Sequence, residues 1–258
     1  MAFQKKIIAF DLDGTLTESK QTMTPEMAVL LSTLATSEQS RKVAIISGGS
    51  FEQFKKQLAP IFAGTLLASD LSHFILLPTS GSQRYEYDQA DNEWKITDKE
   101  EMSKEIKEKI FEAFEKIQSI GIYEIPTEKF GERVEERGTQ ITFSAFGQEA
   151  PIEKKRLWDP DQSKRKKIKE ALELLLPEVD VAIGGMTSID VLHKGFNKAV
   201  GLRRLLTKLD FKLEDIIFVG DAVFPGGNDY SPSQMGIETV SIANPGETAS
   251  LINRWLAM

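Results

Sequence analysis

The sequence contains no cysteine and only two histidines, His73 and His193, among its 258 residues. Without thiols the chain can form neither a disulfide framework nor a thiolate metal site, and two histidines are too few for a typical histidine-built zinc site. Any metal ion must therefore be held by oxygen ligands, which are the ligands that magnesium prefers.

The sequence also lacks a long apolar segment. No stretch approaches the roughly 20 apolar residues of a membrane span, and the first residues lack the apolar length and cleavage site of a signal peptide. We therefore expect a cytoplasmic protein that does not contact a membrane. Acidic residues outnumber basic ones, 39 to 32, which gives a net charge of −7. This excess disfavours nucleic acid as a partner and favours a small anionic substrate, provided that the site concentrates positive charge.

Short apolar runs that end on polar residues are present at three places. They are Ile7–Phe10 before Asp11, Val43–Ile46 before Ser47, and Ile216–Val219 before Gly220. Such runs favour strands that are buried on both faces of a parallel sheet. Helices are predicted after the first two runs, one from Thr24 and Pro25, the other from Ser50 to about Leu58. We therefore expect an α/β fold with a Rossmann-like parallel-sheet core.

The middle of the chain follows a different pattern. Alternating and amphipathic segments predict strands at 84–87, 93–96, 139–146 and 179–183, and helices at 98–118 and 162–176. These elements predict an inserted α+β cap domain at 83–186, with the core formed by 1–82 and 187–258. Residues 187–192 are expected to lead back into the core.

The predicted core strands end on conspicuous polar residues. These are Asp11 and Asp13, then Ser47, Gly48 and Gly49, then Asp221 with Asn228 and Asp229. In open α/β sheets, ligands bind outside the carboxyl ends of the strands. We therefore expect these residues to converge on one crevice.

The first pair, Asp11 and Asp13, has the residue types of a phosphotransfer site. A carboxylate nucleophile divides phosphoryl transfer into two steps through an aspartyl-phosphate, while a second carboxylate handles protons. Asp221 could share a magnesium ion with Asp11. The bend at Gly14 lets both carboxylates face the crevice.

Two further features suit an anionic substrate. Ser47 and the amides of Gly48 and Gly49 precede a predicted helix, whose amino terminus favours an anion, so they describe a phosphate cradle. Lys198 lies near the start of another predicted helix, where its ammonium could neutralise phosphoryl oxygens and neighbouring carboxylates.

Each feature alone also has a plainer interpretation. Asp-x-Asp-Gly occurs in calcium loops, although the preceding apolar strand disfavours that interpretation here. The Ser47 segment could be a simple turn, Lys198 a solvated helix residue, and Gly220 with Asp221 the end of a strand. The order of these features at successive strand ends is what favours phosphotransfer.

In this order the motifs resemble the haloacid-dehalogenase-like superfamily, and the large insertion resembles its type IIB cap. Several stretches are specifically similar to eukaryotic-type phosphomannomutases, above all Gly220–Asp229, which reads Gly-Asp-Ala-Val-Phe-Pro-Gly-Gly-Asn-Asp. The resemblance implies a magnesium-dependent enzyme with Asp11 as nucleophile and metal ligand. It implies that Asp13 is the acid/base and a further metal ligand, that Asp221 binds the metal, and that Lys198 is catalytic.

The resemblance also implies substrate contacts and a possible homodimer formed through the cap. The substrate- and phosphate-binding candidates are Ser47, Gly48, Gly49, Lys20, Arg137, Ser188, Asp190 and Asn228. Phosphomannomutases resemble one another in carrying arginine where this chain has Lys20, Gln148 and Lys155. A mutase needs a second anion site in the cap, for which arginine is better suited than glutamine. Neighbouring basic cap residues could rebuild that site or form a solvated face.

Three functions therefore stay open. The first is a magnesium-dependent phosphatase acting on a small phosphorylated metabolite, a sugar phosphate by class. The second is a phosphomannomutase that interconverts mannose 1-phosphate and mannose 6-phosphate. The third is a non-catalytic sugar-phosphate-binding protein, which the presence of Asp11, Asp13, Lys198 and Asp221 disfavours.

Overall fold

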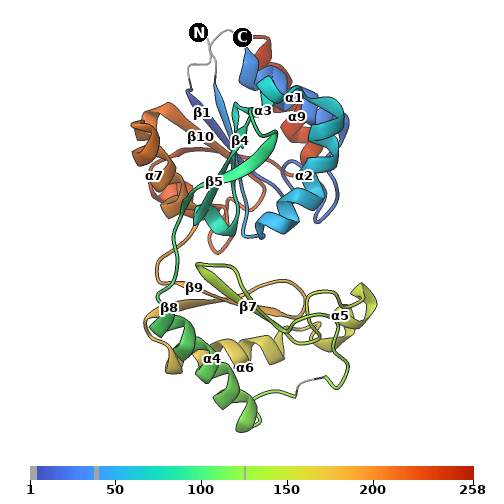
Figure 1. The fold of residues 1–258 in the computed structure, drawn as a ribbon, viewed down its shortest axis with the longest axis vertical. Coiled ribbons are helices and arrows are strands. Elements are labelled where there is room, and N and C mark those ends of the chain that lie inside the picture. The colour runs from blue at the N-terminus through green and yellow to red at the C-terminus, as the bar shows by residue number, and fades with distance from the viewer. Residues whose placement is uncertain (1–4, 38–40, 125) are drawn as a thin grey trace. The chain divides into compact units, whose positions relative to one another are not determined.

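The chain divides into two compact units in the computed structural model, which describes residues 5–37, 41–124 and 126–258 (Figure 1). The core unit comprises the described residues of Met1–Lys99 and Asn197–Met258, and the cap unit those of Glu100–Phe196. The cap is thus an insertion into the sequence of the core, as expected.

The core unit is built on a seven-stranded sheet with the order β11-β10-β1-β2-β3-β4-β5. Its strands are β1 (Ile7–Asp11), β2 (Lys42–Ile46), β3 (Phe74–Leu77), β4 (Gln83–Asp88), β5 (Glu93–Lys99), β10 (Ile216–Gly220) and β11 (Glu238–Ser241). The pairs from β11 to β3 are parallel, whereas β3, β4 and β5 pair antiparallel. This confirms the parallel α/β core.

Helices cover both faces of the parallel strands. They are α1 (Pro25–Thr36), α2 (Phe51–Thr65), α3 (Ala68–Leu71), α7 (Lys198–Leu209), α8 (Tyr230–Gln234) and α9 (Pro245–Leu256), with 3₁₀ turns η1 (Thr79–Gly81) and η2 (Leu213–Asp215). Ile8 and Phe10 share one apolar cluster with α1, α2 and α9, while Ile7 and Ala9 share another with α7 (Figure 1). Successive strand residues point to opposite faces, so a continuous apolar run suits a strand covered on both sides.

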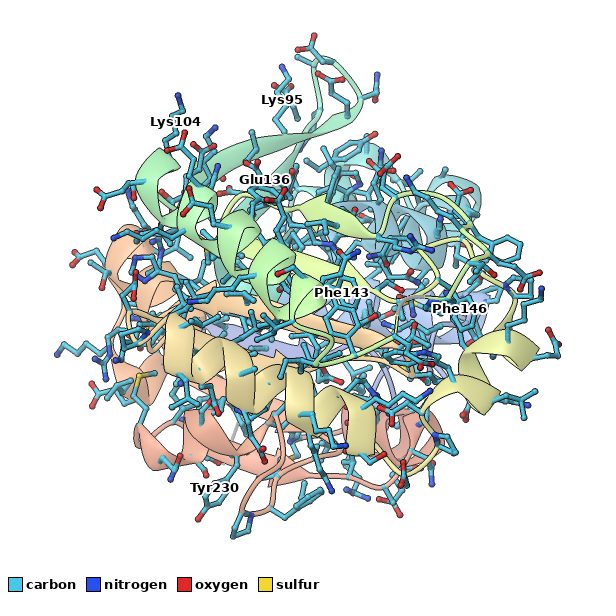
Figure 2. The ribbon with its side chains drawn as sticks, turned by 90° about the horizontal axis from the view of Figure 1, so that it is seen from below. Lys95, Lys104, Glu136, Phe143, Phe146 and Tyr230 are labelled. Carbon is cyan, nitrogen blue, oxygen red and sulfur yellow. The ribbon has the colours of Figure 1, made fainter. Side chains whose placement is uncertain are left out.

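The cap unit has one antiparallel sheet with the order β6-β7-β9-β8. Its elements are α4 (Lys104–Ser119), β6 (Val134–Glu136), β7 (Gln140–Ser144), α5 (Ile152–Trp158), α6 (Ser163–Leu175), β8 (Val179–Ile183) and β9 (Ser188–His193). Helices α4 and α6 lie side by side on one face of this sheet (Figure 2), and Ile110 and Ile168 share one apolar cluster with Phe143. The cap therefore has its own apolar core.

The predicted domain boundaries were wrong at both ends of the insertion. The hairpin of β4 and β5, assigned to a cap at 83–186, extends the core sheet by pairing with β3. Residues 187–192 were assigned to the core, but all except the first of them lie in β9, which pairs with β7 and β8 in the cap. A strand's periodicity shows which of its faces is buried but not which sheet completes its hydrogen bonds.

Other predicted bounds shift by a few residues. Helix α4 begins at Lys104 rather than Asp98, because Asp98 lies in β5. Helix α2 continues to Thr65, past Pro60, beyond the predicted end near Leu58. None of the helices in the described part of the chain combines the length and apolar character needed to cross a lipid bilayer.

Helix α7 packs closely against η1 of the core through a contact between Gly201 and Gly81. A Cβ at Gly201 would lie 2.1 Å from the carbonyl oxygen of Ser80 and 2.8 Å from the Cα of Gly81. Gly81 itself has φ +84°, a conformation that favours glycine. We expect Gly201→Ala to lower the free energy of unfolding by about 1–3 kcal/mol, because the helix must move away from η1.

Gly64 near the end of α2 is the matched control, because a Cβ there meets no atom within 4 Å. Gly64→Ala should leave stability unchanged or raise it by about 0.5 kcal/mol. Urea unfolding of both variants measures the difference. Equal stability of the two would contradict the close helix packing.

Candidate active site at the carboxyl ends of the core strands

The polar residues singled out in the core lie at one edge of the sheet. Asp11 ends β1, Ser47 follows β2, and Asp221 follows β10. These three strands are neighbours in the order β10-β1-β2 and run parallel, so their carboxyl ends meet. The expected convergence of the three motifs is therefore what the structure shows.

Three carboxylates come together at this edge. Asp11, Asp221 and Asp229 each offer an oxygen atom, and these atoms lie within 4.8 Å of one another. Asp11 and Asp229 are buried, and Asp221 is half-buried. Close carboxylate oxygens are the donor set of a hard divalent cation such as Mg²⁺. The three carboxylates thus fit a metal site with oxygen ligands.

Lys198, the first residue of α7, connects two of these carboxylates. Its buried ammonium donates to Asp11 Oδ1 and, at 2.5 Å, to Asp229 Oδ1. The side chain of Asn197 caps α7 by accepting from the Val200 N–H at 3.2 Å, which sets the position of the helix start. Lys198 is therefore a buried partner of the carboxylates rather than a solvated helix residue.

The electrostatics of the cluster favour an added cation. Burial raises the pKa of Asp11 to about 6, although the charge of Lys198 opposes this rise. Burial and the neighbouring Asp229 raise the pKa of Asp221 as well. Burial alone would lower the pKa of Lys198, but its two carboxylate partners raise it. One ammonium thus faces three carboxylates, and a divalent cation would balance the remaining negative charge.

Two glycines give the carboxylates the room to approach the backbone. Gly14 has φ +89°, and a Cβ there would lie 2.5 Å from Asp221 Oδ2. A Cβ at Gly220 would lie 2.6 Å from Asp229 Oδ2. The bend expected at Gly14 is therefore present, and it also makes room for a carboxylate that comes from another strand end.

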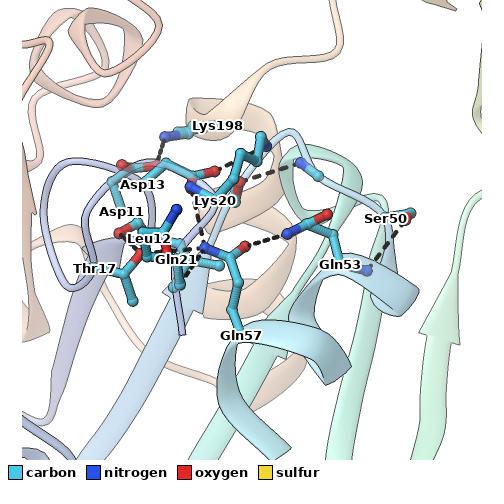
Figure 3. A network of polar contacts seen from close by, with 12 residues as sticks. Asp11, Leu12, Asp13, Thr17, Lys20, Gln21, Ser50, Gln53, Gln57 and Lys198 are labelled. Carbon is cyan, nitrogen blue, oxygen red and sulfur yellow. Dashed lines mark hydrogen bonds and ion pairs between the residues drawn. The ribbon is translucent and has the colours of Figure 1, made fainter. Parts of the chain in front are cut away.

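Asp13 is turned toward a different set of partners (Figure 3). Its Oδ1 accepts from the Lys20 backbone N–H at 2.6 Å and from Gln57 Nε2 at 3.0 Å, and its Oδ2 accepts from Lys20 Nζ at 3.0 Å. Burial raises the pKa of Asp13, but hydrogen bonds and the charge of Lys20 outweigh it and lower the pKa. Asp13 is not part of the three-carboxylate cluster, so its role as a metal ligand stays a prediction.

The Ser47 segment leads into the amino terminus of α2. Ser47 Oγ accepts from the Gly49 N–H at 3.1 Å, and Ser50 Oγ caps the helix by accepting from the Gln53 N–H at 3.4 Å. The backbone of Gly48 is exposed, whereas Ser47 is buried. The geometry combines a turn with a helix start, and phosphate binding there stays a prediction.

The remaining predicted substrate residues lie in the cap unit or in an exposed loop. Arg137 pairs with Glu135, with Nε at 3.0 Å from the carboxylate. Asp190 accepts from the Thr142 hydroxyl at 2.7 Å, and Ser188 lies two residues before it on β9. Asn228 is exposed in the loop before Asp229. Their roles in substrate binding stay predictions.

Two residues of the site were not assigned a role from the sequence. Asp229 follows Asn228 in the Gly-Asp motif and was named there without a function. Gln57 could have been singled out from the sequence, because its spacing places it on the same helix face as Phe54 and Leu58. A glutamine on a buried face needs hydrogen-bond partners there.

The chain belongs to the haloacid dehalogenase-like hydrolase family, which it matches over residues 8–231. Within that class it is a distant relative of phosphomannomutases. The phosphomannomutase of Encephalitozoon cuniculi is 26% identical over 98% of this chain and 94% of the relative. A probable phosphomannomutase of Caenorhabditis elegans is 30% identical over 89% of this chain and 86% of the relative.

Solved structures share the fold. The IMP-nucleotidase of Plasmodium falciparum aligns with a TM-score of 0.70 at 16% identity, over 97% of this chain and 69% of that chain. A haloacid dehalogenase-like hydrolase from Bacteroides thetaiotaomicron aligns with a TM-score of 0.62 at 17% identity, over 97% of this chain and 99% of that chain. At these identities the likeness supports the fold alone, a parallel core with an inserted cap.

The carboxylate cluster predicts measurable cation binding. Asp221→Asn should weaken the binding of Mg²⁺ by roughly tenfold or more, because one charged oxygen ligand becomes a neutral amide. Isothermal titration with Mg²⁺ measures this. Asp91→Asn on the β4–β5 hairpin is the control, because Asp91 pairs with Lys95 at the surface. Equal affinity of the Asp221 variant and the unaltered protein would exclude Asp221 as a ligand.

Proposed function

We propose that this protein is a magnesium-dependent phosphatase that releases phosphate from a small phosphorylated metabolite, a sugar phosphate by class. The observation that carries the proposal is the environment of Asp11. It ends β1, contacts the buried ammonium of Lys198, and shares the carboxylate cluster with Asp221 and Asp229. Asp13 follows two residues later. A nucleophile, a cation site and a second carboxylate are thus combined at one strand end.

The reaction follows from these groups in two steps. In the first, an oxygen of Asp11 attacks phosphorus, the bond from phosphorus to the substrate oxygen breaks, and Asp13 gives that oxygen its proton. In the second, water attacks the aspartyl-phosphate and passes its proton to Asp13. The bond between phosphorus and Asp11 breaks, which releases inorganic phosphate and restores both side chains.

Positive groups must balance the charge on the transferring phosphoryl group. Asp11, Asp221 and Asp229 would hold Mg²⁺, which supplies charge neutralisation at the phosphoryl oxygens. Lys198 holds the Asp11 carboxylate in place through its hydrogen bond. Ser47 and the amides of Gly48 and Gly49 would bind the phosphoryl oxygens at the start of α2.

Phosphomannomutase activity is the second candidate, because the relatives named above carry that name. It would use the same first step and return the phosphoryl group to a sugar hydroxyl. Phosphomannomutases resemble one another in having arginine at the positions of Lys20 and Lys155, and the contacts of these two lysines favour hydrolysis. Lys20 pairs with Asp13, and Lys155 donates to the Gln148 carbonyl at 2.9 Å. Each ammonium is thus engaged within the protein, and neither side chain offers the bidentate guanidinium that suits a second phosphate.

Asp11→Asn tests the nucleophile. Phosphate release from a panel of sugar phosphates with Mg²⁺ should fall by about a thousandfold or more, because an amide does not attack phosphorus. Folding should persist, since Lys198 keeps its contact with Asp229. Circular dichroism and phosphate release are the measurements, with Asp91→Asn as control. An active Asp11 variant would refute the aspartyl-phosphate mechanism.

Product analysis separates the two candidates. The protein is incubated with mannose 1-phosphate, a hexose bisphosphate activator and Mg²⁺, and both free phosphate and mannose 6-phosphate are followed. We expect phosphate to accumulate without isomerisation. Mannose 6-phosphate forming faster than phosphate would establish the mutase instead.

A further inference from the structure

Gln57 is a buried amide on the inward face of α2, only 1% exposed. Its helix neighbours on that face, Phe54 and Leu58, belong to the apolar core. A buried amide without partners costs about 1–3 kcal/mol, so its contacts explain its place there. Those contacts run toward Asp13.

The amide of Gln57 is held in one orientation (Figure 3). Its Nε2 faces Asp13 Oδ1 at 3.0 Å and the Gln21 carbonyl oxygen at 3.1 Å, neither of which can donate when Asp13 is ionised. Its Oε1 accepts from Gln53 Nε2 at 3.0 Å. Turning the amide over would place oxygen against oxygen and nitrogen against nitrogen, so only the observed orientation satisfies all partners.

The loop that carries Asp13 is tied to α2 at the same point. The Met23 N–H donates to the backbone carbonyl of Gln57 at 2.9 Å. The Thr17 hydroxyl lies 3.2 Å from Gln57 Nε2. Gln57 therefore binds the loop through its backbone and the Asp13 carboxylate through its side chain.

The two oxygens of Asp13 differ in how firmly they are held. Oδ1 accepts from the buried Gln57 amide and from the backbone N–H of Lys20, whose φ of +62° directs it there. Oδ2 accepts from the ammonium of Lys20, a side chain 59% exposed. An exposed ion pair of this kind contributes little and is readily exchanged. Oδ1 is thus the anchored oxygen, and Oδ2 the exchangeable one.

We propose that Gln57 is a positioning residue for proton transfer: by holding Oδ1 of Asp13 it leaves Oδ2 to give a proton to the leaving oxygen and to take one from water. This inference rests on the acid/base role of Asp13 in the proposed function. Gln57 itself touches neither the reacting atoms nor the carboxylate cluster. Gln53 acts one step further away by fixing the Gln57 amide.

The test uses two substrates of the same charge and nearly the same shape, phenyl phosphate and p-nitrophenyl phosphate. Phenolate is the poorer leaving group and needs the proton more, so loss of the acid slows phenyl phosphate selectively. Gln57→Leu should lower kcat/KM for phenyl phosphate by about tenfold or more, because kcat/KM covers the steps up to departure of the leaving group and not the later hydrolysis of the aspartyl-phosphate, which is the same for both substrates. The kcat/KM for p-nitrophenyl phosphate should stay within about twofold.

Two further variants guard against a folding defect. Gln57→Met keeps the length of the side chain and removes the amide donor, and it should give the same selective loss. Gln118→Leu is the matched control, because Gln118 is an exposed glutamine on α4 and should leave both rates unchanged. Thermal unfolding of each variant confirms that the rates refer to folded protein.

The Asp13→Asn background decides between positioning and a general structural effect. There, Gln57→Leu should cause no further loss with phenyl phosphate, because the group that it positions is already gone. Equal losses of kcat/KM with both substrates, or a further loss in that background, would overturn the inference. If Asp13→Asn slows phenyl phosphate and Gln57→Leu does not, the inference fails alone. If Asp13→Asn slows neither substrate, the acid role fails and the inference with it.

Discussion

The site depends on the ion pairs that the buried ammonium of Lys198 forms with two carboxylates. Lys198 contacts Asp11 at the end of β1 and Asp229 in the loop after β10, and it begins α7 itself. Removing one partner from a buried ion pair is costly, because the other charge is left without compensation. The start of the helix and two strand ends are therefore held in one arrangement, with an excess of carboxylate charge beside them.

The sheet order determines which residues can meet. Strands β10, β1 and β2 are neighbours and parallel, so segments more than 150 residues apart in the chain end at the same edge. A Cβ at position 14 or 220 would block the close approach of the carboxylates, and glycine at both positions avoids this clash. The proposed nucleophile, the proposed cation ligands and the turn proposed to bind phosphate all follow from this adjacency. Asp13, the proposed acid/base, depends in addition on α2, through Gln57.

Much of the core could be predicted from the sequence, because a strand covered on both faces leaves a continuous apolar run that ends abruptly at the edge. The cap boundaries could not be predicted in the same way. The β4–β5 hairpin has a pattern that suits a core edge as well as a cap sheet, and β9, with Ile189 and Val191 buried, alternates in a way that either sheet could accept. In both cases more than one sheet could supply the partner strand, and the periodicity of a strand does not show which sheet does so.

The class of chemistry can be inferred from the sequence alone, because the types and order of Asp11, Asp13, Lys198 and Asp221 suit phosphotransfer. Tertiary structure decided how these charges are shared. Asp229 rather than Asp13 joins the carboxylate cluster, Lys20 pairs with Asp13, and Gln57 holds Asp13 from a helix. The physical reason is that the partners are distant in sequence. The type of a residue is given at its own position, whereas its partner depends on which helices and strands pack together in the folded chain.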